Sequence, residues 1–277
     1  MTDTKVLVFA ATGNVGRHIV TLLREAGHAV RAVTRDPHAA GLPAGVEVAP
    51  GDLADPATLD ACLAGIDAVF LLWPLHSGER LPAVLDLIAT RARRVVFLGT
   101  GGVPDLPFEE QDKLVHGCGI ESTVLRPSTF AVNTLWWADQ IRAGDVVRGA
   151  YGTLPMSLIH EADMAAVAVR ALTRPGHDGV TYTLTGPEVL TQAEQVRVIG
   201  EVLGRPLRWE ELTREQARQR LLADETFPDS FADVLLDGYG AMLAGPPPLL
   251  TSTVEDVTGV PPRSLRQWVA DHLDDFR

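Results

Sequence analysis

The sequence predicts an α/β protein built on a doubly wound parallel sheet with a smaller, mostly helical C-terminal lobe. Three observations carry this prediction. Apolar segments such as VLVFA, AVFLLW and VVFLG lack the alternation of a half-exposed strand, which indicates strands buried on both faces. Helical segments separate these strands in a βαβα order. The segment VLVFAATGNVGRHIV, residues 6–20, passes from a strand through a glycine-containing turn into a helix.

The first half of the chain is expected to alternate strands with helices. Each strand is a short apolar run, and each helix has apolar residues at helical spacing. The predicted strands span residues 6–10, 28–34, 45–49, 68–73, 94–98 and 122–125. The predicted helices span residues 15–26, 56–64, 81–90 and 109–116. Asp55 is the expected N-cap of the second helix.

After Pro127 the pattern is less regular and predicts the smaller lobe. Helices are expected at residues 133–143, 162–172, 191–203 and 264–276, in two or three pieces within 211–244, and strands at 158–159 and 181–184. Gly204 is well placed to end the third of these helices, and GPPPLL interrupts the chain at 245–250. We therefore expect a sheet lobe over residues 1–150 and a smaller lobe over 151–277, with segments crossing between them.

Composition excludes several classes of partner. The net charge is −12 and the lysines are only Lys5 and Lys113, which argues against nucleic-acid binding. No apolar run approaches the roughly 20 residues of a membrane span, and no signal-peptide pattern is present. Cys62 and Cys118 form no CxxC motif and are expected to be buried thiols. We expect a cytoplasmic monomer or homodimer with no membrane partner and no metal site.

The turn after the first strand predicts a dinucleotide site. Its expected cofactor contacts are Ala10, Thr12, Gly13, Asn14, Val15 and Gly16. Gly13 lets the backbone approach a pyrophosphate, Gly16 lets the helix lie close to the strand, and amides at the helix N-terminus face the phosphates. Ala10 stands where such turns usually begin with glycine, and we expect it to keep a negative φ that tolerates its methyl group. The alternative is a tight connection without a ligand.

The ends of the second and third strands predict how the nucleotide is recognised. Thr34 and Arg35, in VRAVTRDP, stand where an NAD site usually carries an acid. A guanidinium there can pair with a 2′-phosphate, so NADP(H) is predicted over NAD(H), a preference that the charge of Asp36 would weaken. Arg35 could instead be a solvated loop cation. Asp52, in GDLADPATL, could accept a hydrogen bond from an adenine amino group or cap its own turn.

These segments together resemble the NmrA-like branch of the short-chain dehydrogenase superfamily, an atypical group without the standard catalytic tetrad. The resemblance spans nearly the whole chain through AATGNVGRHIV, VRAVTRDP, GDLADPATL, DAVFLLWP, RRVVFLGT, GIESTVLRPSTFAVN and TGPEVLTQAEQVRVIGEVLGRPL. It implies a Rossmann-type lobe and members that reduce quinones, imines, ketones or double bonds, or act as nucleotide-binding regulators. The further cofactor contacts that follow from it are Leu53, Leu72, Trp73, Gly99, Thr100 and Pro127.

The sequence departs from the superfamily at the catalytic residues. No tyrosine is followed by lysine at the fourth position, so the usual Tyr-x-x-x-Lys pair is absent. Thr100 ends the fifth strand where ordinary members carry serine, and Lys113 lies only roughly where some relatives carry a catalytic lysine. These two residues are the catalytic candidates. A plain strand-end hydroxyl and a solvated helix lysine are the alternatives, in which case water or a substrate hydroxyl supplies the proton.

Aromatic residues predict a flat substrate. The expected substrate contacts are Trp73, His76, Phe130, Asn133, Trp136, Trp137, Tyr151 and His160. Trp136 and Trp137 are adjacent, so on a helix one is expected in the core and the other in a pocket; ordinary packing is the alternative for each aromatic residue. The chain is therefore predicted to be an NADPH-dependent reductase of a quinone, ketone or conjugated double bond in an aromatic or polyketide-like molecule. The alternative function is a non-catalytic NADP(H) sensor that acts through a protein partner.

Overall fold

The computed structural model describes residues 4–37, 41–99, 103, 105–223 and 229–277. The chain divides into two compact units, each assembled from three separate segments. The sheet unit contains Met1–Pro127, Glu161–Leu184 and Ser252–Pro261, and the small unit contains Ser128–His160, Thr185–Thr251 and Pro262–Arg277. The units are therefore interleaved along the chain.

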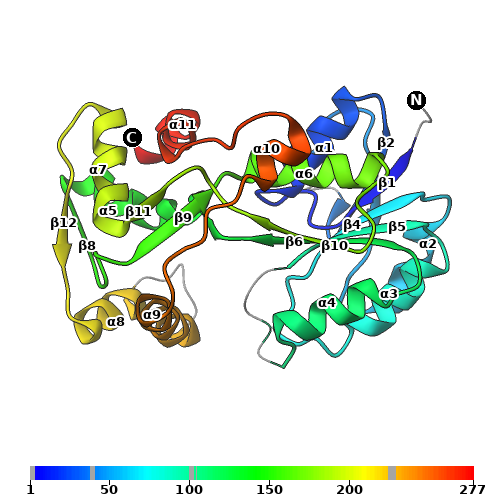
Figure 1. Ribbon diagram of the computed structural model, residues 1–277, viewed down its shortest axis with the longest axis horizontal. Coiled ribbons are helices and arrows are strands. Elements are labelled where there is room, and N and C mark those ends of the chain that lie inside the picture. The colour runs from blue at the N-terminus through cyan, green and yellow to red at the C-terminus, as the bar shows by residue number, and fades with distance from the viewer. Residues whose placement is uncertain (1–3, 38–40, 100–102, 104, 224–228) are drawn as a thin grey trace. The chain divides into compact units, whose positions relative to one another are not determined.

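A seven-stranded parallel sheet forms the centre of the sheet unit (Figure 1), in the order β10-β6-β5-β4-β1-β2-β3. Its strands are β1 (Lys5–Val8), β2 (Ala29–Thr34), β3 (Glu47–Pro50), β4 (Ala68–Leu72), β5 (Arg94–Leu98), β6 (Glu121–Pro127) and β10 (Val180–Leu184). Val8 of β1 lies opposite Ala32 of β2 on one side and Phe70 of β4 on the other. Apart from β10, the strand order 3-2-1-4-5-6 is that of a doubly wound dinucleotide-binding sheet, which confirms the predicted fold class.

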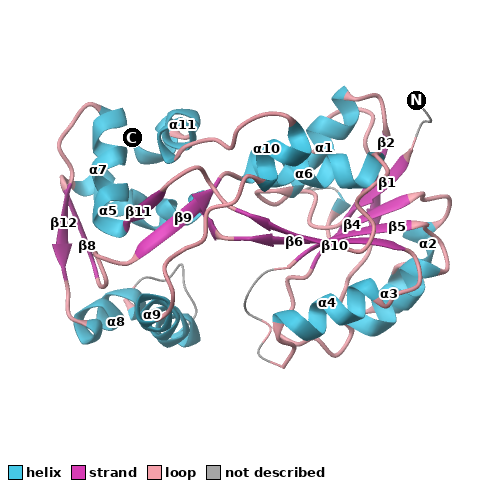
Figure 2. Ribbon diagram, viewed as in Figure 1, coloured by secondary structure: helices cyan, strands magenta, loops and turns pink. Residues whose placement is uncertain are grey.

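Helices cover both faces of this sheet (Figure 2), which explains why its strands are continuously apolar. On one face lie α1 (Gly16–Glu25), α6 (Glu161–Thr173) and α10 (Thr253–Thr258). On the other lie η2 (Pro56–Thr58), α2 (Asp60–Leu63), α3 (Leu81–Ala89) and α4 (Phe108–His116). The helix expected at 56–64 is thus two short pieces, and the Asp55 carboxylate caps the first by accepting from the amide of Ala57.

The small unit contains more strand than the sequence predicts. Its strands form the sheets β11-β9-β7 and β12-β8, and are β7 (Thr129–Phe130), β8 (Val146–Gly149), β9 (Pro155–Ile159), β11 (Val189–Thr191) and β12 (Arg208–Glu211). The helices are η3 (Ala131–Trp137), α5 (Ala138–Ala143), α7 (Gln192–Leu203), α8 (Arg214–Leu222), α9 (Asp229–Ala244), α11 (Leu265–Asp271) and η4 (Leu273–Phe276). The prediction missed β8 and β12 because strands as short and charged as VVRG and RWEE lack an apolar alternation.

Local details agree with several other expectations. Gly204 ends α7 in the left-handed conformation, with φ of 73°. Cys62 is buried as expected, whereas Cys118 is only half-buried. Among the helices that the structure describes, none is long and apolar enough to cross a bilayer.

Candidate functional site

The turn between β1 and α1 packs tightly against the start of the helix. The amide of Gly13 donates to the carbonyl oxygen of Ala10 at 3.0 Å. A Cβ added to Gly16 would overlap that same oxygen and would lie 2.8 Å from the Cα of Ala11. Residue 16 must therefore be glycine if the helix is to lie this close to the strand, which is the packing role expected for it.

The conformation of Ala10 differs from the expectation. Its φ is +52°, in the left-handed region, so the prediction of a negative φ is wrong. The chain leaves β1 so abruptly that this region is needed even though the residue carries a methyl group. A left-handed residue other than glycine costs about 1–2 kcal/mol, so the turn stores strain at its first position.

The start of α1 has the properties of an anion site. Its N-cap residue, Val15, makes no side-chain capping bond, and no acidic side chain occupies the first turn of this fully described helix. The positive end of the helix dipole is thus not neutralised by a side chain of the first turn and favours an anion, although the amide of Arg17 already donates to the carbonyl oxygen of Gly13 at 3.1 Å. Arg17 folds back over the turn, and its guanidinium donates to the carbonyl oxygens of Thr12 at 3.0 Å and Gly13 at 3.4 Å. These features fit a dinucleotide's diphosphate.

The ends of β2 and β3 border a pocket of about 500 Å³. Arg35 and Asp52 both line it, so the structure brings together the two residues expected to recognise the adenosine end. The guanidinium-bearing residue Arg35 is exposed. Thr34 shapes the turn through its hydroxyl oxygen, which accepts from the amide of Asp36 at 3.2 Å. The Asp52 carboxylate accepts from the amide of Ala54 at 2.9 Å, so it does cap its own turn.

The residues expected beside the nicotinamide have mixed placements. Trp73 is buried in the core of the sheet unit, and its indole N–H donates to the carbonyl oxygen of Ser77 at 3.0 Å. The Trp73 ring therefore packs in the core of the sheet unit and does not form the wall of an open pocket. Leu53 is likewise buried, and His76 is exposed in the loop after β4. Thr100, a catalytic candidate, lies outside the described residues.

Lys113 does not have the environment of a catalytic lysine. Its side chain is 68% exposed on α4 and pairs with the Glu110 carboxylate at 2.6 Å, one helical turn away. The hydrogen bond from Glu110 raises the pKa of Lys113, so the amine stays protonated more firmly than a free lysine. These contacts are those of the alternative, a solvated helix lysine, and a catalytic role for Lys113 stays a prediction.

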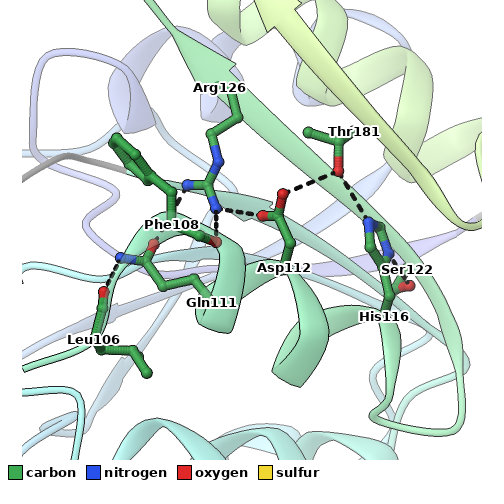
Figure 3. Close-up of polar contacts among 8 residues, drawn as sticks. All are labelled: Leu106, Phe108, Gln111, Asp112, His116, Ser122, Arg126 and Thr181. Carbon is green, nitrogen blue, oxygen red and sulfur yellow. Dashed lines mark hydrogen bonds and ion pairs between the residues drawn. The ribbon is translucent and has the colours of Figure 1, made fainter.

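The sequence analysis missed a cluster around Arg126, near the carboxyl end of β6 (Figure 3). The guanidinium lies 4.3 Å from the centre of the Phe108 ring and donates to the carbonyl oxygen of Phe108 at 2.8 Å. It also donates to the Gln111 side-chain oxygen at 3.3 Å and pairs with Asp112. Burial lowers the pKa of Arg126. A Cβ on Gly99 would overlap this guanidinium, so Arg126 sits directly against the exit of β5.

Further hydrogen bonds tie together the loops that follow β4 and β5. The buried Gln111 donates from its side-chain nitrogen to the carbonyl oxygen of Leu106 at 2.8 Å. Leu106 packs closely on Gly78, where a Cβ would come within 2.5 Å of its side chain. The Asp105 carboxylate accepts from the Ser77 hydroxyl at 2.7 Å and the Gly78 amide at 2.9 Å. Arg126 and Gln111 thereby belong to a network that fixes the carboxyl edge of the sheet.

The cluster continues from Arg126 along the outer side of α4 (Figure 3). The second carboxylate oxygen of Asp112 accepts from the Thr181 hydroxyl at 3.5 Å. The His116 ring lies between two hydroxyls, 3.0 Å from that of Thr181 and 2.9 Å from that of Ser122. This chain of contacts joins α4 to β6 and β10. It braces the helix that carries the partners of Arg126.

Two predicted substrate residues of the small unit lie at one cavity. Trp136 and Trp137 both line a space of about 80 Å³, although only one was expected to face a pocket. They belong to the 3-10 helix η3 (Ala131–Trp137). The ring of Tyr151, at φ +65°, packs edge to face on Tyr239, which also lines the cavity.

The other predicted substrate residues of the small unit lie apart from this lining. Phe130 and Asn133 are half-buried in β7 and η3. His160 is buried, with its ring nitrogen 3.4 Å from the carboxylate of Asp271. Pro127, a predicted cofactor contact, ends β6 one residue after Arg126.

Comparison with known proteins agrees with this geometry. The NAD(P)H-binding family model matches residues 10–175. The chain is 39% identical over 283 residues to (4-alkanoyl-5-oxo-2,5-dihydrofuran-3-yl)methyl phosphate reductase of Streptomyces griseus, covering 98% of this chain and 99% of that protein. It is 36% identical over 286 residues to NAD(P)H azoreductase of Xenophilus azovorans, with the same shares covered. The crystal structure of an NADPH-dependent quinone oxidoreductase from Escherichia coli superimposes with a TM-score of 0.79 at 25% identity, over 97% of this chain and 99% of that one.

The two relatives and the crystal structure match nearly the full length of the chain, and the family model begins at Ala10, within the turn that precedes the uncapped start of α1. They confirm the resemblance found in the sequence. The chain belongs to the NAD(P)H-binding family and is an NAD(P)H-dependent oxidoreductase.

Proposed function

We propose that this oxidoreductase reduces a quinone, a ketone or a conjugated double bond in a flat aromatic or polyketide-like molecule, and that it prefers NADPH to NADH. The observation that carries the proposal is the uncapped start of α1 beside the strained turn, with Arg35 bordering a pocket of about 500 Å³. The names of two relatives describe reduction of an oxo-dihydrofuran phosphate and of azo compounds, which are planar conjugated acceptors.

Different residues of the chain would bind different parts of the cofactor. The amides that open α1, with the guanidinium of Arg17 close by, would hold the diphosphate. Arg35 would pair with the 2′-phosphate, because a guanidinium matches phosphate geometry with two parallel hydrogen bonds. When bound, NADPH supplies a hydride to the electrophilic atom of the substrate. Arg126 and Gln111 would keep the loops at the carboxyl edge in place, so that substrate and cofactor meet in a defined geometry.

The proton required by the reduction would come from water or from the substrate. Lys113 points into solvent in an ion pair, and the sequence has no Tyr-x-x-x-Lys pair. A quinone reduced by hydride transfer yields a phenolate that water can protonate, so no strong side-chain acid is needed. This requirement favours acceptors whose reduced form is a stabilised anion, such as quinones and conjugated carbonyl compounds.

The cofactor preference is tested with Arg35→Glu. The variant loses the charge-assisted pair between the guanidinium and the 2′-phosphate and adds repulsion between two negative groups. The Kd for NADPH should therefore rise about 100-fold, while the Kd for NADH should change less than about threefold. Isothermal titration calorimetry on the purified protein measures both constants. Arg91→Glu makes the same change of charge at an exposed arginine that pairs with Asp60, and it should alter neither constant. Equal losses for NADPH and NADH would reject the assignment of Arg35.

The reaction is tested by following NADPH oxidation with a naphthoquinone, an azo dye, an acyl-substituted unsaturated lactone and an aromatic ketone. We expect stoichiometric oxidation with at least one of them, matched by reduced product identified by mass spectrometry. Tight NADPH binding without turnover on any member of the panel would reject the proposed reaction and favour the alternative, an NADP(H) sensor.

A further inference from the structure

A second cavity lies wholly within the small unit and is walled by aromatic rings. Its volume is about 80 Å³, and its lining includes Trp136, Trp137, Trp209 and Tyr239. Trp137 and Trp209 meet edge to face with ring centres 5.7 Å apart. Burial raises the pKa of Tyr239 to about 12, so its hydroxyl stays neutral at physiological pH. The cavity therefore offers aromatic rings and a neutral tyrosine hydroxyl, and its lining also includes polar side chains.

The ring of Trp209 is held rigidly in this wall. Its indole N–H donates to the Glu211 carboxylate at 2.7 Å. A Cβ on Gly149 would come within 2.5 Å of the indole, and one on Gly152 would overlap the indole nitrogen. The same Glu211 carboxylate accepts from the amides of Tyr151 at 2.6 Å and Gly152 at 2.9 Å. Because these contacts fix the ring in advance, a ligand would lose little entropy in ordering the wall.

The aromatic cavity adjoins a more polar pocket of about 170 Å³. Gln140, Arg148 and Arg220 line both spaces, so they stand where the two meet. Gln140 is fixed by β8, since its side-chain oxygen accepts from the amide of Arg148 at 2.8 Å. Two guanidinium-bearing residues thus border the junction between the aromatic cavity and this pocket.

The described carboxylates nearest to this junction form ion pairs with arginines. Glu210 serves two guanidinium groups, those of Arg148 at 2.9 Å and Arg208 at 3.6 Å. Asp145, which lines the polar pocket, is paired with Arg205 at 3.4 Å. Arg220 is exposed, and within the described part of the chain no carboxylate pairs with it. Among the described residues that line the two spaces, the arginines are Arg148 and Arg220 and the acid is Asp145.

We propose that the small unit binds a small aromatic anion here, with the edge of the ring in the aromatic cavity and the carboxylate or phosphate at Arg148 and Arg220. An apolar cavity of about 150 Å³ can hold benzene, so a space of about 80 Å³ receives the edge of a single ring while the anionic group occupies the 170 Å³ pocket. A single-ring anion fits this division of space and charge. The proposal does not depend on the reductase proposal, because binding is measured without cofactor or turnover.

The test is a titration of tryptophan fluorescence with benzoate and, separately, with phenyl phosphate. Three of the five tryptophans line the cavity, so a bound ring should change the emission saturably. Benzyl alcohol, which has the same ring without charge, should bind at least tenfold more weakly. Saturation by either anion supports the site, and the tighter of the two identifies the anionic group that it prefers.

Matched variants locate the binding. Arg220→Gln, at an exposed position that tolerates substitution, should weaken the anion about tenfold because it removes a charge-assisted hydrogen bond. Arg91→Gln, at an exposed arginine of the sheet unit, should leave the affinity unchanged. Ala217→Leu should abolish binding by filling the cavity that Ala217 lines. A response that fails to saturate, equal affinity for benzyl alcohol, or unchanged affinity in Arg220→Gln would overturn the proposal.

Discussion

Replacing Ala10 by glycine should stabilise the protein, although the change removes a methyl group. Ala10 has φ of +52°, and releasing an alanine from that region gains about 1–2 kcal/mol. Glycine gives the unfolded chain more conformational freedom, which lowers the free energy of unfolding by about 0.4–1 kcal/mol. Loss of the half-buried methyl group lowers the free energy of unfolding by about 0.3 kcal/mol more. The net expectation for Ala10→Gly is a gain of about 0.5 kcal/mol in the free energy of unfolding.

Gly27→Ala provides the opposite change at a comparable backbone position. Its φ is +81°, and an added Cβ would meet no atom within 4 Å, so only the backbone conformation is altered. The same arithmetic without the methyl term gives a loss of about 0.8 kcal/mol. The two variants should therefore differ by about 1.3 kcal/mol, or roughly 3–5 °C in Tm for a chain of this size.

Differential scanning calorimetry of wild type and both variants measures these shifts. The reasoning requires Ala10→Gly to melt above wild type and Gly27→Ala below it. A decrease in Tm for Ala10→Gly would show that the methyl group packs more favourably than its backbone is strained, and the strain argument for the turn would be refuted.

Three further outcomes are expected. Lys113→Gln should leave kcat/KM within about twofold of wild type in the NADPH oxidation assay, because the solvent-exposed amine is paired with Glu110. A loss of tenfold or more would favour a catalytic role for Lys113. Arg126→Ala should lower kcat/KM at least about tenfold while its circular dichroism spectrum stays unchanged. Arg126→Lys should recover only part of this loss, because one ammonium group cannot replace a planar guanidinium that contacts three residues. Full recovery in Arg126→Lys would mean that the positive charge alone accounts for the role of Arg126. Hydrogen bonds from Lys5 and Arg31 hold the pKa of Glu47 below its usual range, so this carboxylate stabilises the fold above its ordinary pKa and loses that effect as pH falls through the lowered value. Glu47→Gln should therefore lower Tm at neutral pH and approach the Tm of wild type once the pH falls below the lowered pKa; a difference independent of pH would contradict the assignment.

The sequence was informative where burial on both sides of the sheet controls residue choice. Strands such as Arg94–Leu98 are continuous apolar runs, and their order with the helices was enough to predict the doubly wound sheet. The turn was recognised because close packing demands glycine at position 16. The conformation of Ala10 was not predictable, since alanine ordinarily avoids positive φ and only the surrounding structure imposes it.

The site around Arg126 shows why other features were missed. Its partners Phe108, Gln111 and Asp112 lie on a different element, and no local spacing indicates that they converge on β6. The segment VLRP was noted only for its resemblance to a family, and nothing in its composition marks the arginine as a buried cation. Likewise, the cavity that Trp136 and Trp137 both line is completed by Trp209 and Tyr239 from distant segments, which no local pattern around residues 136 and 137 indicates.

The interleaving of the two units has a consequence for how the chain is made and handled. Residues 252–277 contribute to the core of each unit. Val254 of α10 is buried beside α6 in the sheet unit, and Trp268 of α11 is buried in the core of the small unit. During synthesis on the ribosome, neither unit can close its core until this last segment has emerged. No single cleavage of the polypeptide can release either unit intact, so truncation would be a poor route to an isolated cofactor-binding module.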